Sequence, residues 1–211
     1  MTAKERPILF SGDMVRAILD GRKTMTRRVV KIAQHPQAER VQHFEGLRWD
    51  WLRYDGLRLS TFKCPFGKTG DRLWVRETFR LSDPNDCACY EPCRCRSGQP
   101  MYRADGHYHD MEYKWKPSIY MPRWSSRITL EITDIRVERL QDISEDDADS
   151  ECFGGDIPGN IFPDLFPGNF DAWGHLSIPE CFGRVWDAIN GQGSWSANPW
   201  VWVLEFKRLA P

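Results

Sequence analysis

The segment GRKTMTRR at residues 21–28 brings cationic and hydroxyl side chains close together along the chain. Residues 23–28 alone supply one lysine, two threonines and two arginines, and Arg22 adds a further guanidinium. Such donors, presented together, bind phosphates and carboxylates well. The segment is therefore a candidate binding or catalytic site whose cations include Lys23, Arg27 and Arg28, with a solvated basic turn as the alternative.

The residues around this segment predict how the chain presents it. Apolar side chains recur at helical spacing over residues 13–20, and Ser11 or Asp13 is placed to cap the start of that helix. Gly21 is expected just beyond the helix end, in the left-handed conformation that a Cβ disfavours. β-Branched residues then favour an extended segment at 28–31.

A second set of candidate binding residues lies on a predicted strand at 72–77. Its alternation places Trp74 and Arg76 on the face opposite two apolar side chains. A polar face of this kind can line a ligand pocket, and an outward-facing arginine is the alternative.

Aromatic and cationic residues interleave over residues 113–124, which include Arg123 and Trp124. This composition is typical of a surface that stacks on bases and contacts phosphates. A hydrophobic staple across the mouth of a barrel is an equally consistent interpretation.

A cysteine group lies within a predicted insertion at about residues 82–112. Four thiols follow the pattern C-x-C-x3-C-x-C, at Cys87, Cys89, Cys93 and Cys95. Four thiolates can hold one structural Zn²⁺ tetrahedrally, although the spacing within each pair is shorter than in common zinc knuckles. Free thiols or a redox pair are the alternatives, and Cys64, His107 and His109 are substitute ligands.

The acidic run near residue 145 predicts a helix start. Ser144 is expected to cap it, and carboxylates in a first helical turn are favoured by the helix dipole. Glu151 lies further along, where the dipole gives it little stabilisation. We therefore single out Glu151 as a candidate functional carboxylate.

Composition narrows the class of protein. The chain has 211 residues, 41% of them hydrophobic, with a formal net charge of −1 and ten tryptophans. A balanced charge argues against binding of extended duplexes but allows a local basic patch to bind a short strand or a single nucleotide. The sequence contains neither a long apolar run nor a secretory signal, so we expect a cytoplasmic protein without a membrane partner. Oligomeric state cannot be predicted.

The pattern of elements predicts an α+β fold in a single domain over residues 1–211. A hairpin is expected with Asp55-Gly56 at its turn. Further strands are expected at 126–139 and 200–206, with a helix at 182–190. Residues 153–179 are rich in glycine, proline, asparagine and phenylalanine, and predict a loop packed by its own aromatic side chains.

Five segments of the sequence resemble the ASCH domain family, a branch of the PUA-like small β-barrels linked to RNA. They are PILFS at 7–11, ILDGRKTMTRR at 18–28, GDRLWVRE at 70–77, ITDIRVERL at 132–140 and NPWVWVLEF at 198–206. The later segments are similar to larger phage- and prophage-type members, and the match spans nearly the whole chain. The resemblance implies a PUA-like β-barrel with flanking helices and loop insertions.

The resemblance also implies a site. Small members of the family include amidohydrolases that remove the acetyl group of N4-acetylcytidine with a lysine, a threonine and a glutamate. Carried over, these are Lys23, Thr26 and Glu151, whose chemistry suits activation of a hydroxyl nucleophile. The implied ligand is RNA, single-stranded nucleic acid or a modified nucleoside. The alternatives are a non-catalytic binding module and a phage-encoded regulator of a host protein, with an exposed apolar patch at 161–173.

Overall fold

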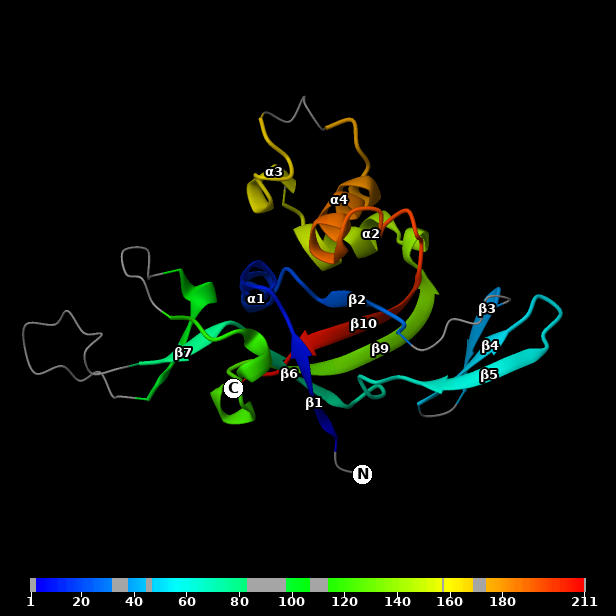
Figure 1. Ribbon diagram of the computed structural model, residues 1–211, viewed down its shortest axis with the longest axis horizontal. Helices are drawn as coiled ribbons and strands as arrows, with labels where there is room; N and C mark the ends of the chain where they lie inside the picture. The colour runs from blue at the N-terminus through cyan, green and yellow to red at the C-terminus, as the bar shows by residue number, and fades with distance from the viewer. Residues whose placement is uncertain are drawn as a thin grey trace, which may run out of the picture.

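The computed structural model describes residues 3–31, 38–44, 47–82, 98–106, 114–156, 158–168 and 174–210. The described chain has an α+β fold, as the sequence predicts, with helices stacked over one face of a curved sheet (Figure 1). That sheet has five strands in the order β1 (Glu5–Leu9), β6 (Arg72–Arg76), β9 (Thr129–Arg139), β10 (Trp200–Arg208) and β2 (Met25–Val29). β1 and β6 are parallel, and the other pairs are antiparallel.

β10 separates two hydrophobic cores because its side chains alternate between two covered faces. Trp200, Trp202, Leu204 and Phe206 belong to one core, and Val201 and Val203 belong to the other. Burial on both faces explains why the strand is apolar at nearly every position. The predicted strand and the predicted alternation are both confirmed.

The first core is closed by a three-stranded sheet of β3 (Arg40–His43), β4 (Arg48–Leu52) and β5 (Arg58–Lys63). The predicted hairpin is confirmed between β4 and β5, with Gly56 in the left-handed region at φ +84°. Trp49 of β4 packs edge-on against Trp202 at a centroid distance of 5.3 Å, and Trp51 contacts Trp200 at 5.6 Å. Tryptophans of this sheet are therefore core residues rather than exposed stacking surfaces.

The second core lies under the helical layer, which consists of α2 (Glu145–Ala148), the π-helix Asp149–Phe153, α3 (Pro158–Ile161) and α4 (Ile178–Asn190). Ser144 caps α2 as predicted, through a bond from the Asp147 amide. α4 begins four residues earlier than expected, because Ser177 and Glu180 form a capping box that the sequence analysis overlooked.

The predicted aromatic loop is only partly a loop. α3 lies within it, and Phe162 and Phe166 pack into the second core. Phe166 is buried, and Phe162 is half-buried against Phe153. In the described part of the apolar patch expected at 161–173, residues 161–168, the aromatic side chains therefore pack inward, and the exposed positions are Pro163, Asp164, Pro167 and Gly168.

α1 (Gly12–Leu19) and the segment after it match the sequence prediction closely. Ser11 caps the helix, and Gly21 adopts φ +77°. The strand that follows begins at Met25, three residues before the expected position. Pairing with β10 explains the difference, because a long neighbouring strand supplies backbone partners to residues of modest strand propensity.

The remaining described elements are short. They are β7 (Phe79–Leu81), β8 (Pro100–Tyr102), and the 3-10 turns Arg103–Asp105, Ser118–Tyr120, Arg123–Ser125 and Leu140–Asp142. Within the described ranges the strand pairings leave the five-stranded sheet open, with β1 and β2 as its edges. None of the described helices has the length and hydropathy needed to cross a lipid bilayer.

Candidate functional site

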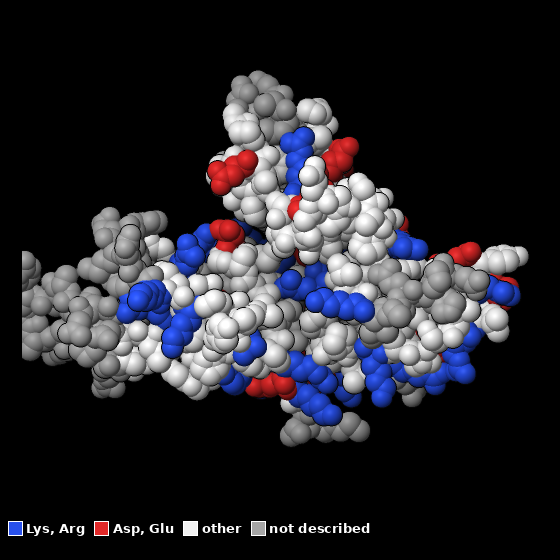
Figure 2. Space-filling view, viewed as in Figure 1, with Lys and Arg blue, Asp and Glu red and all other residues white. Residues whose placement is uncertain are grey.

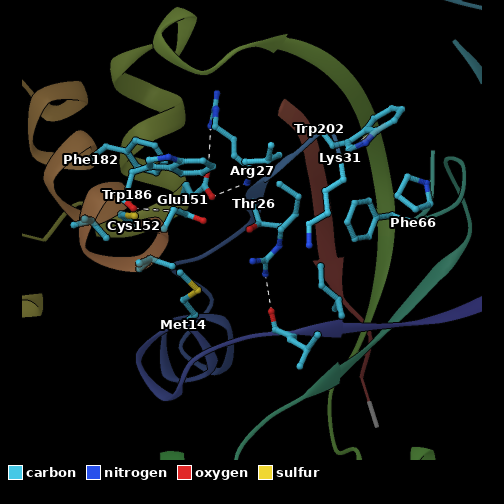
Figure 3. A pocket seen from close by; sticks show the side chains of 18 of the residues that line it. Met14, Thr26, Arg27, Lys31, Phe66, Glu151, Cys152, Phe182, Trp186 and Trp202 are labelled. Atoms are coloured by element: carbon cyan, nitrogen blue, oxygen red, sulfur yellow. Dashed lines mark hydrogen bonds and ion pairs between the residues drawn. The ribbon is translucent and has the colours of Figure 1, made fainter. Parts of the chain in front are cut away.

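A cavity of about 600 Å³ is lined by both edge strands of the large sheet, β1 and β2, and by α4; Figure 3 shows its side chains. β1 contributes residues 7–9 to its wall, β2 contributes residues 26–29, and α4 covers it with apolar side chains. The wall also contains Phe66, Glu151 and Trp202. The second half of the segment first selected for its chemistry, residues 26–28, thus lines a cavity, whereas Gly21 and Thr24 are exposed.

Glu151 and Arg27 form the central contact beside this cavity. The Arg27 backbone N–H donates to Glu151 Oε1 at 2.6 Å, and Arg27 Nη1 donates to Glu151 Oε2 at 3.0 Å. The Arg27 side chain is fully buried and that of Glu151 is 5% exposed. A charge-assisted contact at two points in a buried setting fixes β2 against the π-helix.

The other end of the Arg27 guanidinium meets two more carboxylates. Nη2 donates to Glu138 at 2.6 Å and to Asp147 at 2.7 Å. Burial alone would lower the pKa of Arg27, but the surrounding carboxylates, led by Glu151, outweigh it and raise that pKa. Arg27 therefore stays charged and has a structural role. Only the part of Arg27 that lines the cavity is available to contact a ligand.

Lys23 lies behind Glu151 and is buried. Its Nζ donates to the Glu151 backbone carbonyl at 2.7 Å and lies 3.8 Å from Glu151 Oε1. Burial lowers the pKa of Lys23 below its ordinary value, and the Glu151 carboxylate offsets only part of that effect. Lys23 thus pairs with Glu151, a contact that a purely structural role also explains, and Lys23 is not among the residues that line the cavity.

Thr26 is the cavity-lining hydroxyl of the predicted site. It is buried, pairs through its backbone with Leu204, and sits on the same strand as Arg27. Across the described ranges its hydroxyl makes no hydrogen bond. Within those ranges, no contact of the hydroxyl therefore assigns it a structural role.

Cys152 also lines the cavity and is a poor nucleophile there. Burial raises the pKa of its thiol to about 12, with the charge of Lys23 opposing that rise. A thiol with this pKa is almost entirely protonated at neutral pH. Among the nucleophilic side chains that line the cavity, the hydroxyl of Thr26 is thus the better candidate.

Two further predicted binding arginines have different positions. Arg28 lines the cavity, where its Nη2 donates to the Leu9 carbonyl at 2.6 Å and its guanidinium lies 5.1 Å from the Phe10 ring. Arg22 pairs with Asp20 at 2.9 Å outside the cavity wall. Only Arg28 is placed to meet a ligand in the cavity.

The remaining predicted binding residues form a separate group. Arg76 donates to the Met121 carbonyl at 3.0 Å and stacks over Trp74 at 5.0 Å. Arg123 pairs with Glu5 at 2.8 Å, and Trp124 is 64% exposed beside a shallow aromatic hollow. None of these four predicted residues lines the cavity beside Thr26. The binding residues predicted from the sequence therefore belong to two different surfaces.

The sequence analysis missed several wall residues. Phe66, Trp186 and Lys31 were not selected, although all three line the cavity (Figure 3). Phe66 sits in a turn fixed by Asp71, which accepts from the backbone amides of Lys4 and Lys68. The turn residues before the predicted strand at 72–77 signalled a turn at this position. They did not indicate the direction in which the Phe66 side chain points.

The zinc prediction lies outside the described residues, because Cys87, Cys89, Cys93 and Cys95 all fall between residues 83 and 97. It stays a prediction. Over the part of the chain that the structure describes, no group of three or more His, Cys, Asp or Glu side chains is arranged to hold a metal ion.

Comparisons with protein families, with curated proteins and with solved structures found no match to this chain. Function is therefore argued from the geometry of the cavity.

Proposed function

We propose that the cavity binds a modified nucleoside, and that Thr26 attacks an acyl amide on its base. The observation that carries the proposal is that Thr26 and Glu151 line one cavity, with Lys23 bonded directly behind Glu151. A volume of about 600 Å³ is in the range of small-molecule sites and suits one nucleoside.

Aromatic walls support a flat ligand. Phe66, Phe182, Trp186 and Trp202 all contribute to the cavity surface, and bases stack on such rings without strong sequence preference. The indole N–H of Trp186 is buried and has no hydrogen-bond partner within the described ranges. This nitrogen is closed off from solvent, so the indole contributes to the cavity through the rest of its ring.

The unpaired edge of β2 offers a further way to recognise a base. Alternate residues of β2 direct their backbone groups toward β10, and the bond from the Arg27 N–H to Glu151 shows that Arg27 and Val29 direct theirs away from it. Glu151 takes the Arg27 N–H, and Val29 also lines the cavity. The Val29 N–H and the carbonyls beside it supply a donor and acceptors for the edge of a base.

The proposed chemistry is acyl transfer through the hydroxyl. Thr26 Oγ1 attacks the acyl carbonyl carbon, its proton passes to the Glu151 carboxylate and from there to the exocyclic nitrogen, and the bond from the acyl carbon to that nitrogen breaks. That nitrogen leaves as an amine after taking a proton, and water then hydrolyses the ester on Thr26. Lys23 has a lowered pKa and therefore gives up a proton more readily than an ordinary lysine, and its Nζ lies 3.8 Å from Oε1 of the Glu151 carboxylate.

We propose that the chain forms a PUA-like barrel that remains open between its edge strands β1 and β2. Both edges of the curved sheet, β1 and β2, line the same cavity, and Arg28 bridges them by its bond to Leu9. This arrangement is consistent with the resemblance to the ASCH family, which stays a prediction together with an RNA or single-stranded nucleic-acid partner.

The experiment that tests the proposal measures release of acetate from N4-acetylcytidine by the purified chain. Turnover that is lost in Thr26→Val and Glu151→Gln, while both variants stay folded by circular dichroism, is the expected result. A folded wild-type protein that releases no acetate from the nucleoside, the nucleotide or an acetylated oligonucleotide would sink the catalytic proposal.

A non-catalytic binding module is the second candidate, and one observation favours it. Across the described chain, no hydrogen bond joins Thr26 to Lys23 or Glu151, so the hydroxyl is not activated before ligand binding. Catalytic contacts often tighten only with substrate bound. Calorimetric binding of cytidine without any turnover of its acetylated form would select this candidate.

A further inference from the structure

The cavity wall carries more positive charge than its ion pairs neutralise. Four charged residues line it, and two of them, Arg27 and Glu151, are paired with each other. Arg28 and Lys31 are the other two, and neither has a carboxylate partner in the described part of the chain. The wall therefore offers two cations for an anionic group of a ligand.

These two cations occupy one side of the site. Arg28 lies two residues beyond Thr26, about 7 Å along an extended strand. The side chain of Lys31 extends from beyond the end of β2 into the cavity (Figure 3). A pyrimidine ring with its ribose spans a distance on this scale, so a base edge near Thr26 brings the 5′ position toward Arg28.

Arg28 is held ready for such a contact. One nitrogen of its guanidinium donates to the Leu9 carbonyl at 2.6 Å, and the ring of Phe10 lies 5.1 Å from its centre. This arrangement fixes the planar group, and within the described residues no other bond of the guanidinium occurs. Arginine presents paired donors that match the oxygens of a phosphate, and Lys31 adds a mobile point charge.

We infer that the ligand carries a phosphate that Arg28 and Lys31 bind, so that the substrate class is a 5′-nucleotide or a nucleotide within RNA. The inference rests on the proposed function for its base-binding half. Free nucleosides enter the same cavity but lack the group that meets these two cations. Lys and Arg side chains are spread over the middle and lower part of the face in Figure 2, which also favours an anionic ligand.

The test is isothermal titration of the whole chain with cytidine and with cytidine 5′-monophosphate, in low and high salt. The monophosphate should bind at least tenfold more tightly than cytidine, and salt should reduce that ratio. Lys31→Gln should lower the ratio several-fold, and Arg28→Gln with Lys31→Gln should abolish it. Lys63→Gln, at an exposed lysine outside the cavity wall, is the matched control.

A short cytidine-containing oligoribonucleotide separates the two sources of the phosphate. Tighter binding than the monophosphate assigns the site to RNA, and weaker binding assigns it to the free nucleotide. Three results would overturn the inference. They are equal binding of cytidine and its monophosphate, binding of neither compound, and a phosphate preference that survives the double substitution. Acetate release from N4-acetylcytidine in those cases would leave the proposed function standing.

Discussion

Glu151 holds residue 27 at two points: one carboxylate oxygen accepts from the Arg27 backbone amide at 2.6 Å, and the other accepts from its guanidinium at 3.0 Å. This contact ties the π-helix to β2 and fixes the strand that carries Thr26. Because Lys23 also bonds to the Glu151 carbonyl, one glutamate organises the whole predicted set. Structure and chemistry therefore depend on the same residue and must be separated by experiment.

Replacement of the Thr26 hydroxyl tests the chemistry with little effect on the fold. Thr26→Val keeps the β-branched shape in β2, and the lost hydroxyl makes no hydrogen bond within the described residues. We expect acetate release to fall on the order of 10²-fold or more, with thermal stability unchanged or slightly raised. Thr24→Val removes an exposed hydroxyl two residues away and should leave activity intact. Full activity in Thr26→Val would rule out this nucleophile.

Removal of the Glu151 charge tests the ion network. Glu151→Gln leaves the buried guanidinium of Arg27 with one fewer carboxylate and Lys23 without its nearby anion. We expect a loss of about 3–5 kcal/mol in the free energy of unfolding, measured by urea denaturation. Glu145→Gln, at an exposed carboxylate of α2, should change it little. Equal stability of the two variants would show that the network contributes nothing.

Asp71 provides a pH test of the turn that carries Phe66. Burial alone would raise the pKa of Asp71, but bonds from the amides of Lys4 and Lys68 and from Arg6 outweigh it, so the pKa lies below its ordinary value of 3.8. A carboxyl whose pKa is lowered by folding stabilises the fold fully at a pH above its unfolded pKa. This stabilisation is lost as the pH falls through the folded pKa.

Asp71→Asn should therefore cost about 1–3 kcal/mol of unfolding free energy at neutral pH, and the difference from wild type should shrink below pH 3.8. Denaturation midpoints measured across this range check the prediction. Asp142→Asn, at an exposed carboxylate, is the control. A difference that stays constant down to the most acidic samples would contradict the role assigned to the charge.

Two neighbouring glycines test the close approach between the π-helix and the basic segment. Both have left-handed backbones, but a Cβ on Gly154 would lie 2.5 Å from Arg22 Cβ, whereas one on Gly155 meets nothing within 4 Å. Gly154→Ala should destabilise the fold by about 1–3 kcal/mol more than Gly155→Ala, because only the first overpacks. Comparable melting temperatures for the two variants would show that the backbone shifts at residue 154 without loss of stability.

Phe66 tests stacking in the cavity. Truncation to alanine removes one aromatic wall, so Phe66→Ala should weaken nucleotide binding by about 1–3 kcal/mol, roughly 5- to 150-fold. Phe44→Ala removes a 39% exposed ring that does not line the cavity and serves as the comparison. Titration calorimetry on both variants measures the effect, and unaltered affinity in Phe66→Ala would exclude this ring from the binding surface.

Much of the local structure follows from the sequence because its causes are local. The cap at Ser11, the left-handed Gly21, the hairpin turn at Gly56 and the alternation of β10 each depend on a few adjacent residues. Their signals are backbone sterics, hydrogen-bond capacity and hydrophobic period, which are readable along the chain.

The site itself depended on contacts between distant segments. Arg27 and Glu151 are separated by 124 residues, and only the packing of the π-helix on β2 brings them together. The sequence singled out Glu151 by its place beyond the helix start, and it grouped Arg27 with the candidate binding arginines Arg22 and Arg28. Burial decides the difference, since a buried guanidinium needs carboxylate partners whereas an exposed one does not.

The sequence by itself determined the α+β pattern of elements and which residue types are available for chemistry. Tertiary structure decided which of them share a cavity: Thr26, Arg28 and Glu151 line it, whereas Trp74 and Arg123 lie on another surface. The physical reason is that strand pairing and sheet curvature set the position of each edge, and neither is encoded in the spacing of residues along one strand.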